Sequence, residues 1–99
     1  MKQVVVIYGM PKDTSHFNQY YEEVHVLLVQ RMPHLRAFQY SKGEVQSSSA
    51  EFAPHLVATL TYDTDADLAA SLESAEGKAA VADVANFASG GVTILTVTI

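Results

Sequence analysis

The chain has 99 residues, of which 48% are hydrophobic and none is cysteine, and its formal net charge is -5. We expect one domain over residues 1–99, because this length supports one hydrophobic core and no linker-like stretch interrupts it. An acidic surface repels nucleic-acid phosphates, no apolar run is long enough to span a membrane, and no secretion signal is recognisable. The composition therefore predicts a cytoplasmic protein that binds neither nucleic acid nor membranes and has no disulfide or thiolate metal site.

The first predicted strand covers residues 2–8, where β-branched residues precede a turn containing glycine and proline. A helix is predicted over residues 13–32, from a polar capping segment to the residue before a proline, which disfavours helical backbone. On a helical wheel its apolar side carries Phe17, Tyr20, Tyr21, Val24, Leu27, Leu28 and Met32. His25 falls at the margin of that side.

The remaining elements alternate between strand and helix. In order they are a strand over residues 35–45, a polar hairpin loop over 46–51, a strand over 55–62, a helix over 66–87 and a last strand over 92–99. The second helix follows an acidic cap and is predicted to be interrupted at Gly77. The order βαββαβ indicates an α+β, ferredoxin-like fold, with a four-stranded antiparallel sheet and all helices on one face.

Three of the predicted strands, over residues 2–8, 55–62 and 92–99, carry apolar side chains on both faces. A sheet covered by helices on one face only should instead alternate between apolar and polar residues. An open apolar face of this size is rarely left in water. We therefore predict a homodimer in which two sheets pack face to face as an α/β barrel.

His25 is the main catalytic candidate, because a histidine beside an apolar helix face can enter a cleft and act as a general acid or base. The alternative is a structural histidine hydrogen-bonded to the backbone. Aromatic residues that would wall such a cleft for a small apolar ligand are Tyr8, Tyr20, Tyr21, Phe38, Tyr40 and Phe87. The alternative for these rings is that they fill the core.

A metal site is not predicted. Glu22 and His25 form a single Glu-x-x-His pair, whereas a di-iron bundle needs two such pairs and further carboxylates. No nucleotide-binding, zinc-peptidase or nucleophile-elbow motif occurs, so no cofactor is predicted. His16 and His34 are given no role, and His55 ranks below His25 because it begins a strand.

Two patterns together resemble the EthD family of dimeric α/β-barrel proteins. They are Phe17-x-x-Tyr20-Tyr21-x-x-x-His25 with Met32-Pro33-x-Leu35, and Ser74-x-Glu76-Gly77 with Asp83-x-x-Asn86-Phe87 and a double glycine. The resemblance implies that His25 is the family's helix histidine and that Asp83, Asn86 and Phe87 belong to its C-terminal signature. The chain departs from the family at Leu27, where proline is usual, and at His34, where glycine is usual.

The EthD family takes its name from ethyl tert-butyl ether degradation, and related barrels include cofactor-independent monooxygenases, haem-degrading enzymes, muconolactone isomerases and stress-responsive proteins. The resemblance implies binding of a small, largely apolar organic compound, with an accessory or catalytic role in catabolism. His25 would be a proton-transfer group or a polar anchor, and Tyr8, Tyr21, Phe38, Tyr40, Asn86 and Phe87 would contact the ligand. Two alternatives stay open: a non-catalytic ligand-binding or stress protein, and a haem-binding or cofactor-independent monooxygenase-like barrel.

Overall fold

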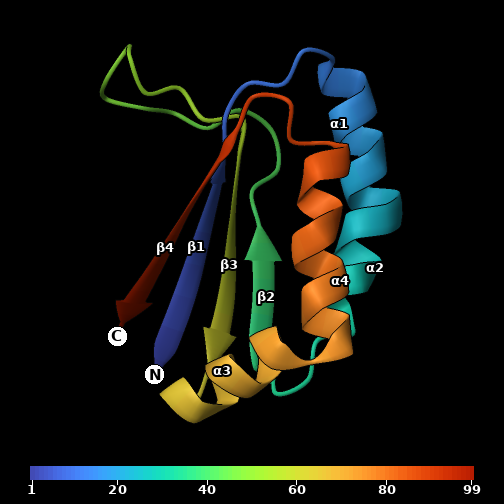
Figure 1. Ribbon diagram of the computed structural model, residues 1–99. Helices are drawn as coiled ribbons and strands as arrows, with labels where there is room; N and C mark the ends of the chain where they lie inside the picture. The colour runs from blue at the N-terminus through green and yellow to red at the C-terminus, as the bar shows by residue number, and fades with distance from the viewer.

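The structure is a computed structural model that describes residues 1–99 as one sheet with its helices on one face (Figure 1). Its elements are β1 (Lys2–Tyr8), α1 (Thr14–Tyr20), η1 (Tyr21–His25), α2 (Val26–Gln30), β2 (Ala37–Tyr40), β3 (Leu56–Tyr62), α3 (Asp65–Glu73), α4 (Ala75–Asp83), η2 (Val84–Asn86) and β4 (Val92–Thr98). The strands lie in the order β2-β3-β1-β4, and every neighbouring pair is antiparallel. This arrangement confirms the predicted ferredoxin-like fold. None of the helices is long and apolar enough to cross a membrane.

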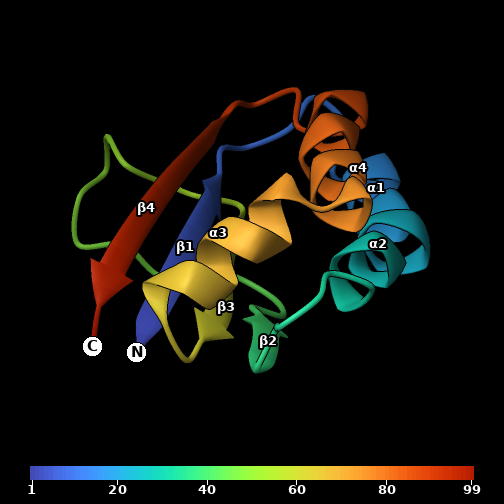
Figure 2. The ribbon, with the colours of Figure 1, turned by 60° about the horizontal axis from the view of Figure 1, so that its bottom comes forward.

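The core lies between the sheet and the helices, which gather over β2 and β3 and leave β4 uncovered (Figure 2). One half of the core packs around Val4, Val29 and Tyr62, and the other packs around Tyr8, Phe17 and Phe87. The second half contains four buried aromatic residues, which meet where α1, η1 and η2 approach the end of β1. The candidate site lies in this aromatic half.

The first helix contains a π-helical turn, η1, between α1 and α2. A π-helical turn accommodates one extra residue, so the buried side of the helix is displaced by one position beyond it. Val24 and Leu27, predicted on the apolar side, are therefore 37% and 50% exposed, whereas His25 and Val26 are buried. The prediction that His25 lies at the margin of the buried side is wrong.

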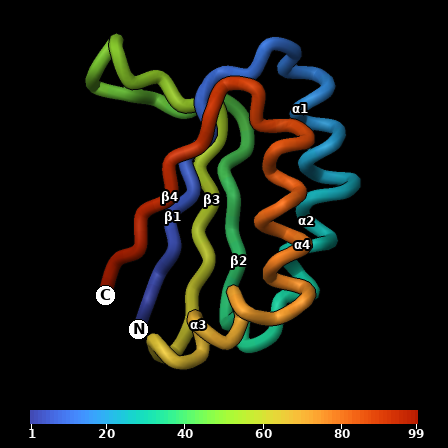
Figure 3. The backbone as a smooth tube through the Cα atoms, in the orientation of Figure 1, coloured from blue at the N-terminus to red at the C-terminus, as the bar shows by residue number.

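The second strand is shorter than predicted, because β2 ends at Tyr40 instead of residue 45. Gly43 has a φ of 75°, a left-handed conformation that an extended strand cannot contain. The segment 41–55 forms a long connection, here called the arm, which projects beyond β4 (Figure 3). The predicted hairpin loop is therefore the tip of a longer irregular segment.

The interruption of the second long helix is at Ser74, so the prediction of a break at Gly77 is wrong. Ser74 has extended backbone (φ -66°, ψ 160°) and its hydroxyl accepts a hydrogen bond from the Gly77 N–H at 2.9 Å, which caps α4. Gly77 lies within α4 for a different reason. A Cβ atom at Gly77 would be 2.0 Å from the backbone oxygen of Ser71, so only glycine permits this approach between α3 and α4.

The face of the sheet opposite the helices, here called the open face, mixes aliphatic side chains with threonines and glutamines. The strand register places Val5 opposite Leu95 and Ile7 opposite Val57 on this face. Leu95 is 47% exposed and Val97 is 36% exposed. The predicted two-sided apolar character of the strands is therefore present, and the helices leave one side uncovered.

His34 is the one residue other than glycine with a positive φ, at 64°. This conformation strains residues with a Cβ atom, which explains why glycine suits the position. We expect His34→Gly to raise the free energy of unfolding by up to about 1 kcal/mol, measured by urea denaturation. The long, half-exposed contact between His34 and Asp67, at 3.7 Å, contributes little that would be lost. An equal or larger gain in His34→Ala would contradict the role of backbone strain.

Candidate functional site

The carboxylate of Asp83 accepts three side-chain hydrogen bonds at the seam between the first helix and α4. Its Oδ2 accepts from His25 Nδ1 at 3.0 Å, and its Oδ1 accepts from the Tyr20 hydroxyl at 2.5 Å and from Asn86 Nδ2 at 3.0 Å. Asp83 is the last residue of α4, and η2 turns the chain so that Asn86 reaches back to it. His25 is the last residue of η1, so the π-helical turn aims its ring at Asp83.

The protonation states of this pair follow from burial and hydrogen bonding. Burial opposes ionisation of Asp83, but the hydrogen bonds from Tyr20, Asn86 and His25 outweigh it and lower its pKa. Burial lowers the pKa of His25, although the Asp83 carboxylate acts in the opposite direction. Near neutral pH the site therefore holds an aspartate and a neutral imidazole whose Nδ1–H faces the carboxylate. The lone pair that can accept a proton is on Nε2.

The Nε2 atom of His25 makes no hydrogen bond in the structure, although only 4% of the residue is exposed. No buried side-chain nitrogen or oxygen lacks a partner, so Nε2 retains some accessible surface. The imidazole lies 4.7 Å from the Phe87 ring and 5.3 Å from the Tyr21 ring, measured between centroids. The imidazole is thus oriented by a buried carboxylate and surrounded by aromatic rings.

Two tyrosines in the same aromatic cluster also carry hydroxyl groups without a hydrogen-bond partner. Tyr8 and Tyr21 are both buried, and their rings lie 5.7 Å apart. Burial raises the pKa of Tyr8, and the charge of Asp83 adds to this effect. Burial also raises the pKa of Tyr21, followed by the nearby Tyr8 and Tyr40. Both hydroxyls therefore remain protonated near neutral pH.

Most of the sequence candidates come together, but not around one cavity. His25, Tyr8, Tyr21 and Phe87 share the aromatic cluster, and Asn86 joins it through Asp83. Tyr40 contacts the outer side of this cluster, with its ring 5.3 Å from that of Tyr21. Phe38 contacts Tyr40 at 5.7 Å and packs into the core, so its link to His25 is indirect.

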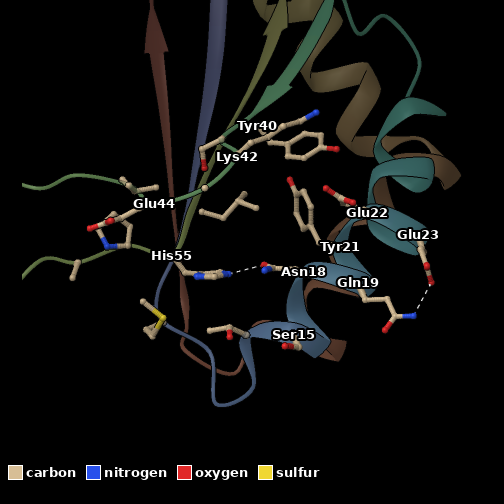
Figure 4. Close-up of a pocket in the computed structure, with 18 residues that line it drawn as sticks. Ser15, Asn18, Gln19, Tyr21, Glu22, Glu23, Tyr40, Lys42, Glu44 and His55 are labelled. Atoms are coloured by element: carbon tan, nitrogen blue, oxygen red, sulfur yellow. Dashed lines mark hydrogen bonds between the residues drawn. The ribbon is translucent and has the colours of Figure 1, made fainter.

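A groove of about 940 Å³ opens between the first helix and the arm (Figure 4). Tyr21 and Tyr40 line it, together with polar residues that include Asn18, Glu22 and His55. His25 and Asp83 do not line it, so Tyr21 separates the groove from the hydrogen-bonded pair. Asn18 Oδ1 lies 2.8 Å from Nε2 of His55 and ties the arm to α1.

Sequence reasoning missed the role of Tyr20, which was listed only as a possible wall of a cleft. Its hydroxyl donates to Asp83, and this hydrogen bond is the main reason that the pKa of Tyr20 is raised. Sequence reasoning also ranked His55 low and gave Asn18 no role, although both line the groove. No local pattern signals these contacts, because they join residues 63 and 37 positions apart.

Comparison with known proteins places the chain in a family. The EthD domain model matches residues 11–91. An uncharacterised 11.0 kDa protein encoded in the thcB-thcC intergenic region of Rhodococcus erythropolis is 38% identical over 95 residues, covering 96% of this chain and 91% of that protein. The chain belongs to the EthD family. The matched range includes both sequence patterns described above, the one with His25 and the one with Asp83.

Solved structures agree with this EthD assignment. An EthD family protein from Bacillus halodurans has a TM-score of 0.89 and 26% identity, with 100% of this chain and 98% of that chain covered. A dimeric ferredoxin-like protein from Thermobifida fusca has a TM-score of 0.73 and 12% identity, with 99% and 90% covered. The second likeness concerns the fold alone.

Proposed function

We propose that this EthD-family protein binds a small, largely apolar organic compound and transfers a proton to or from it, as an accessory or catalytic protein in catabolism. The observation that carries the proposal is the free Nε2 of His25, held by Asp83 among aromatic rings. The apolar ring of Phe87 lies beside the imidazole, and Tyr8, whose hydroxyl has no hydrogen-bond partner, packs against Phe87 in the same aromatic cluster.

The roles of the side chains follow from their positions. His25 Nε2 removes a proton from the ligand, and the resulting imidazolium is stabilised by the Asp83 carboxylate 3.0 Å from Nδ1. Tyr20 and Asn86 hold the other carboxylate oxygen and thereby fix the orientation of Asp83. They are positioning residues, because they touch Asp83 rather than the ligand.

The test is hydrogen–deuterium exchange into a panel of apolar ketones and phenols, followed by mass spectrometry in D₂O. We expect wild-type protein to accelerate exchange into at least one compound and His25→Gln to lower the rate by about 10²- to 10⁴-fold without preventing binding. The rate should fall as the pH drops through the lowered pKa of His25, because protonation removes the lone pair on Nε2. Exchange rates that are equal in both proteins would refute the catalytic role.

The exchange experiment also tests the non-catalytic alternative, and a second experiment tests the haem alternative. A compound that binds but exchanges no hydrogen in either protein would favour a non-catalytic ligand-binding or stress protein. Titration with haemin covers the haem alternative, because ligation by His25 would shift the Soret band of wild-type protein and not that of His25→Gln. Small molecules retained by the purified protein in native mass spectrometry would extend the panel beyond ketones and phenols.

We further propose that the protein is a homodimer in which two open faces pack together as an α/β barrel. The support is the aliphatic side chains on that face, where Val5 and Val57 are only half-buried and Leu95 is 47% exposed. Burial of such a surface in a second copy is strongly favourable in water. The dimeric state stated for the Thermobifida fusca protein concerns that protein, and its fold is shared.

Replacing Leu95 with glutamate should convert the dimer to a monomer, because the substitution places a charge at the centre of the apolar contact. Sedimentation velocity at micromolar concentration measures the change. Leu72→Glu is the matched control, since Leu72 is an exposed leucine on α3, outside the open face. A wild-type protein that sediments as a folded monomer would refute the dimer.

A further inference from the structure

The groove between the first helix and the arm contains a polar side-chain atom, the Tyr21 hydroxyl, that makes no hydrogen bond within the protein. Tyr21 is 1% exposed and lines the groove, yet its hydroxyl has no hydrogen-bond partner. Because no fully buried side-chain oxygen is without a partner, this hydroxyl keeps its small accessible surface. In Figure 4 it points into the groove. An unpaired polar atom of a buried side chain, facing an open volume, is a position where a ligand gains a hydrogen bond.

Other oxygen atoms surround the same part of the groove. Figure 4 shows the Glu22 carboxylate beside the Tyr21 ring and the Tyr40 ring above the Tyr21 hydroxyl, so all three side chains lie at the same end of the groove. The rings of Tyr21 and Tyr40 lie 5.3 Å apart at 66°, so their surfaces form a corner. A carboxylate and two phenol oxygens beside aromatic faces make a surrounding that attracts positive charge.

The other charged groups of the groove leave an excess of negative charge. Glu23 and Glu44 also line it, and the Glu23 carboxylate turns away to a 3.5 Å contact with Gln19. The opposing cation is Lys42, whose ammonium lies 5.8 Å from the centre of the Tyr40 ring. The Tyr40 ring therefore already makes a cation–π contact with an ammonium group of the protein. His55 is turned to Asn18, which holds its Nε2 at 2.8 Å.

The geometry points to a binding site for a small organic cation in this groove, distinct from the His25 pair. The ammonium group of the ligand lies against Glu22, Tyr21 and Tyr40, and its hydrocarbon part contacts apolar residues of the lining, which include Leu56. An anion is repelled by the carboxylates, and a neutral analogue lacks the attraction to Glu22 and to the ring faces.

The test uses three probes that share one ring: benzylammonium, benzyl alcohol and benzoate. Each is titrated into the full chain at pH 7, and backbone amide chemical shifts are followed by NMR. We expect benzylammonium to bind most tightly and to shift amides of α1, η1 and the arm, whereas benzoate does not bind. Equal or tighter binding of benzyl alcohol or benzoate, or shifts confined to other parts of the chain, would overturn the proposal.

Variants that remove a negative or a positive charge from the groove should change the affinity for benzylammonium in opposite directions. Glu22→Gln should weaken benzylammonium binding about five- to tenfold, and Lys42→Met should strengthen it about threefold by removing the competing cation. Tyr21→Phe should also weaken binding, since it removes only the hydroxyl. Glu73→Gln is the matched control, because it removes one exposed carboxylate at the end of α3, outside the groove. If Glu73→Gln weakens binding as much as Glu22→Gln, the proposed site is wrong.

Discussion

Replacing Asp83 with alanine lowers the free energy of unfolding by about 2–3 kcal/mol, as expected when buried hydrogen-bond donors lose their acceptor. The substitution leaves His25 Nδ1 without an acceptor at a site where both residues are buried, 4% and 7% exposed. It also releases the hydroxyl of Tyr20 and the amide of Asn86. Urea denaturation monitored by circular dichroism measures the loss.

The control for this substitution is Asp63→Ala. Asp63 forms a surface contact with Arg36 at 3.6 Å, and both side chains are at least half exposed. Removing it should change the free energy of unfolding by less than about 1 kcal/mol. Asp83→Asn retains one acceptor oxygen and should fall between wild type and Asp83→Ala. A loss in Asp83→Ala no larger than that of the control would mean that the pair does not stabilise the fold.

The pH dependence of stability follows from the same pair. The pKa of His25 is lowered in the folded protein, so the unfolded chain binds more protons below about pH 6.5 and stability falls as the pH drops. The pKa of Asp83 is also lowered, which adds a second loss below about pH 4. His25→Gln should remove the first loss and leave the second.

Replacing Gly77 with alanine should cost about 3 kcal/mol of unfolding free energy, although alanine favours helices. The added methyl group would lie 2.0 Å from the Ser71 oxygen and 3.0 Å from the Leu72 Cα, both backbone atoms that move only if α3 and α4 separate. Thermal and urea denaturation measure the effect.

Ala79→Gly provides the matched control for Gly77→Ala, because it makes the reverse exchange at an exposed position of the same helix. It should cost about 1 kcal/mol through helix propensity alone. If Gly77→Ala is instead stabilising, α3 and α4 do not approach as closely as the structure indicates.

The strands and their pairing were accessible from the sequence because apolar periodicity and turn residues are local signals. The two-sided apolar character of β1, for example, is readable from residues 2–8 alone. The groove and the acceptor role of Asp83 were not accessible in this way. The contact between His25 and Asp83 joins residues 58 positions apart, and only the family resemblance connected them beforehand.

The two wrong predictions, of the helix break and of the position of His25, have local physical causes. The break expected at Gly77 was placed there because glycine disfavours helices, but Ser74 supplies the cap and glycine supplies the space. The helical wheel assumed a regular α-helix, and η1 departs from that regularity without any proline or glycine inside it. His25 therefore looked peripheral in the sequence and is buried in the structure.

The π-helical turn also affects how this chain is aligned with its relatives. A relative with the same number of residues in this segment but a continuous α-helix would present its equivalent imidazole rotated by about 100° around the axis. That ring would no longer face the end of α4. Whether a homologue's histidine faces the end of α4 as His25 does therefore depends on the helical form of the segment that follows its tyrosine pair, as well as on the presence of the histidine itself.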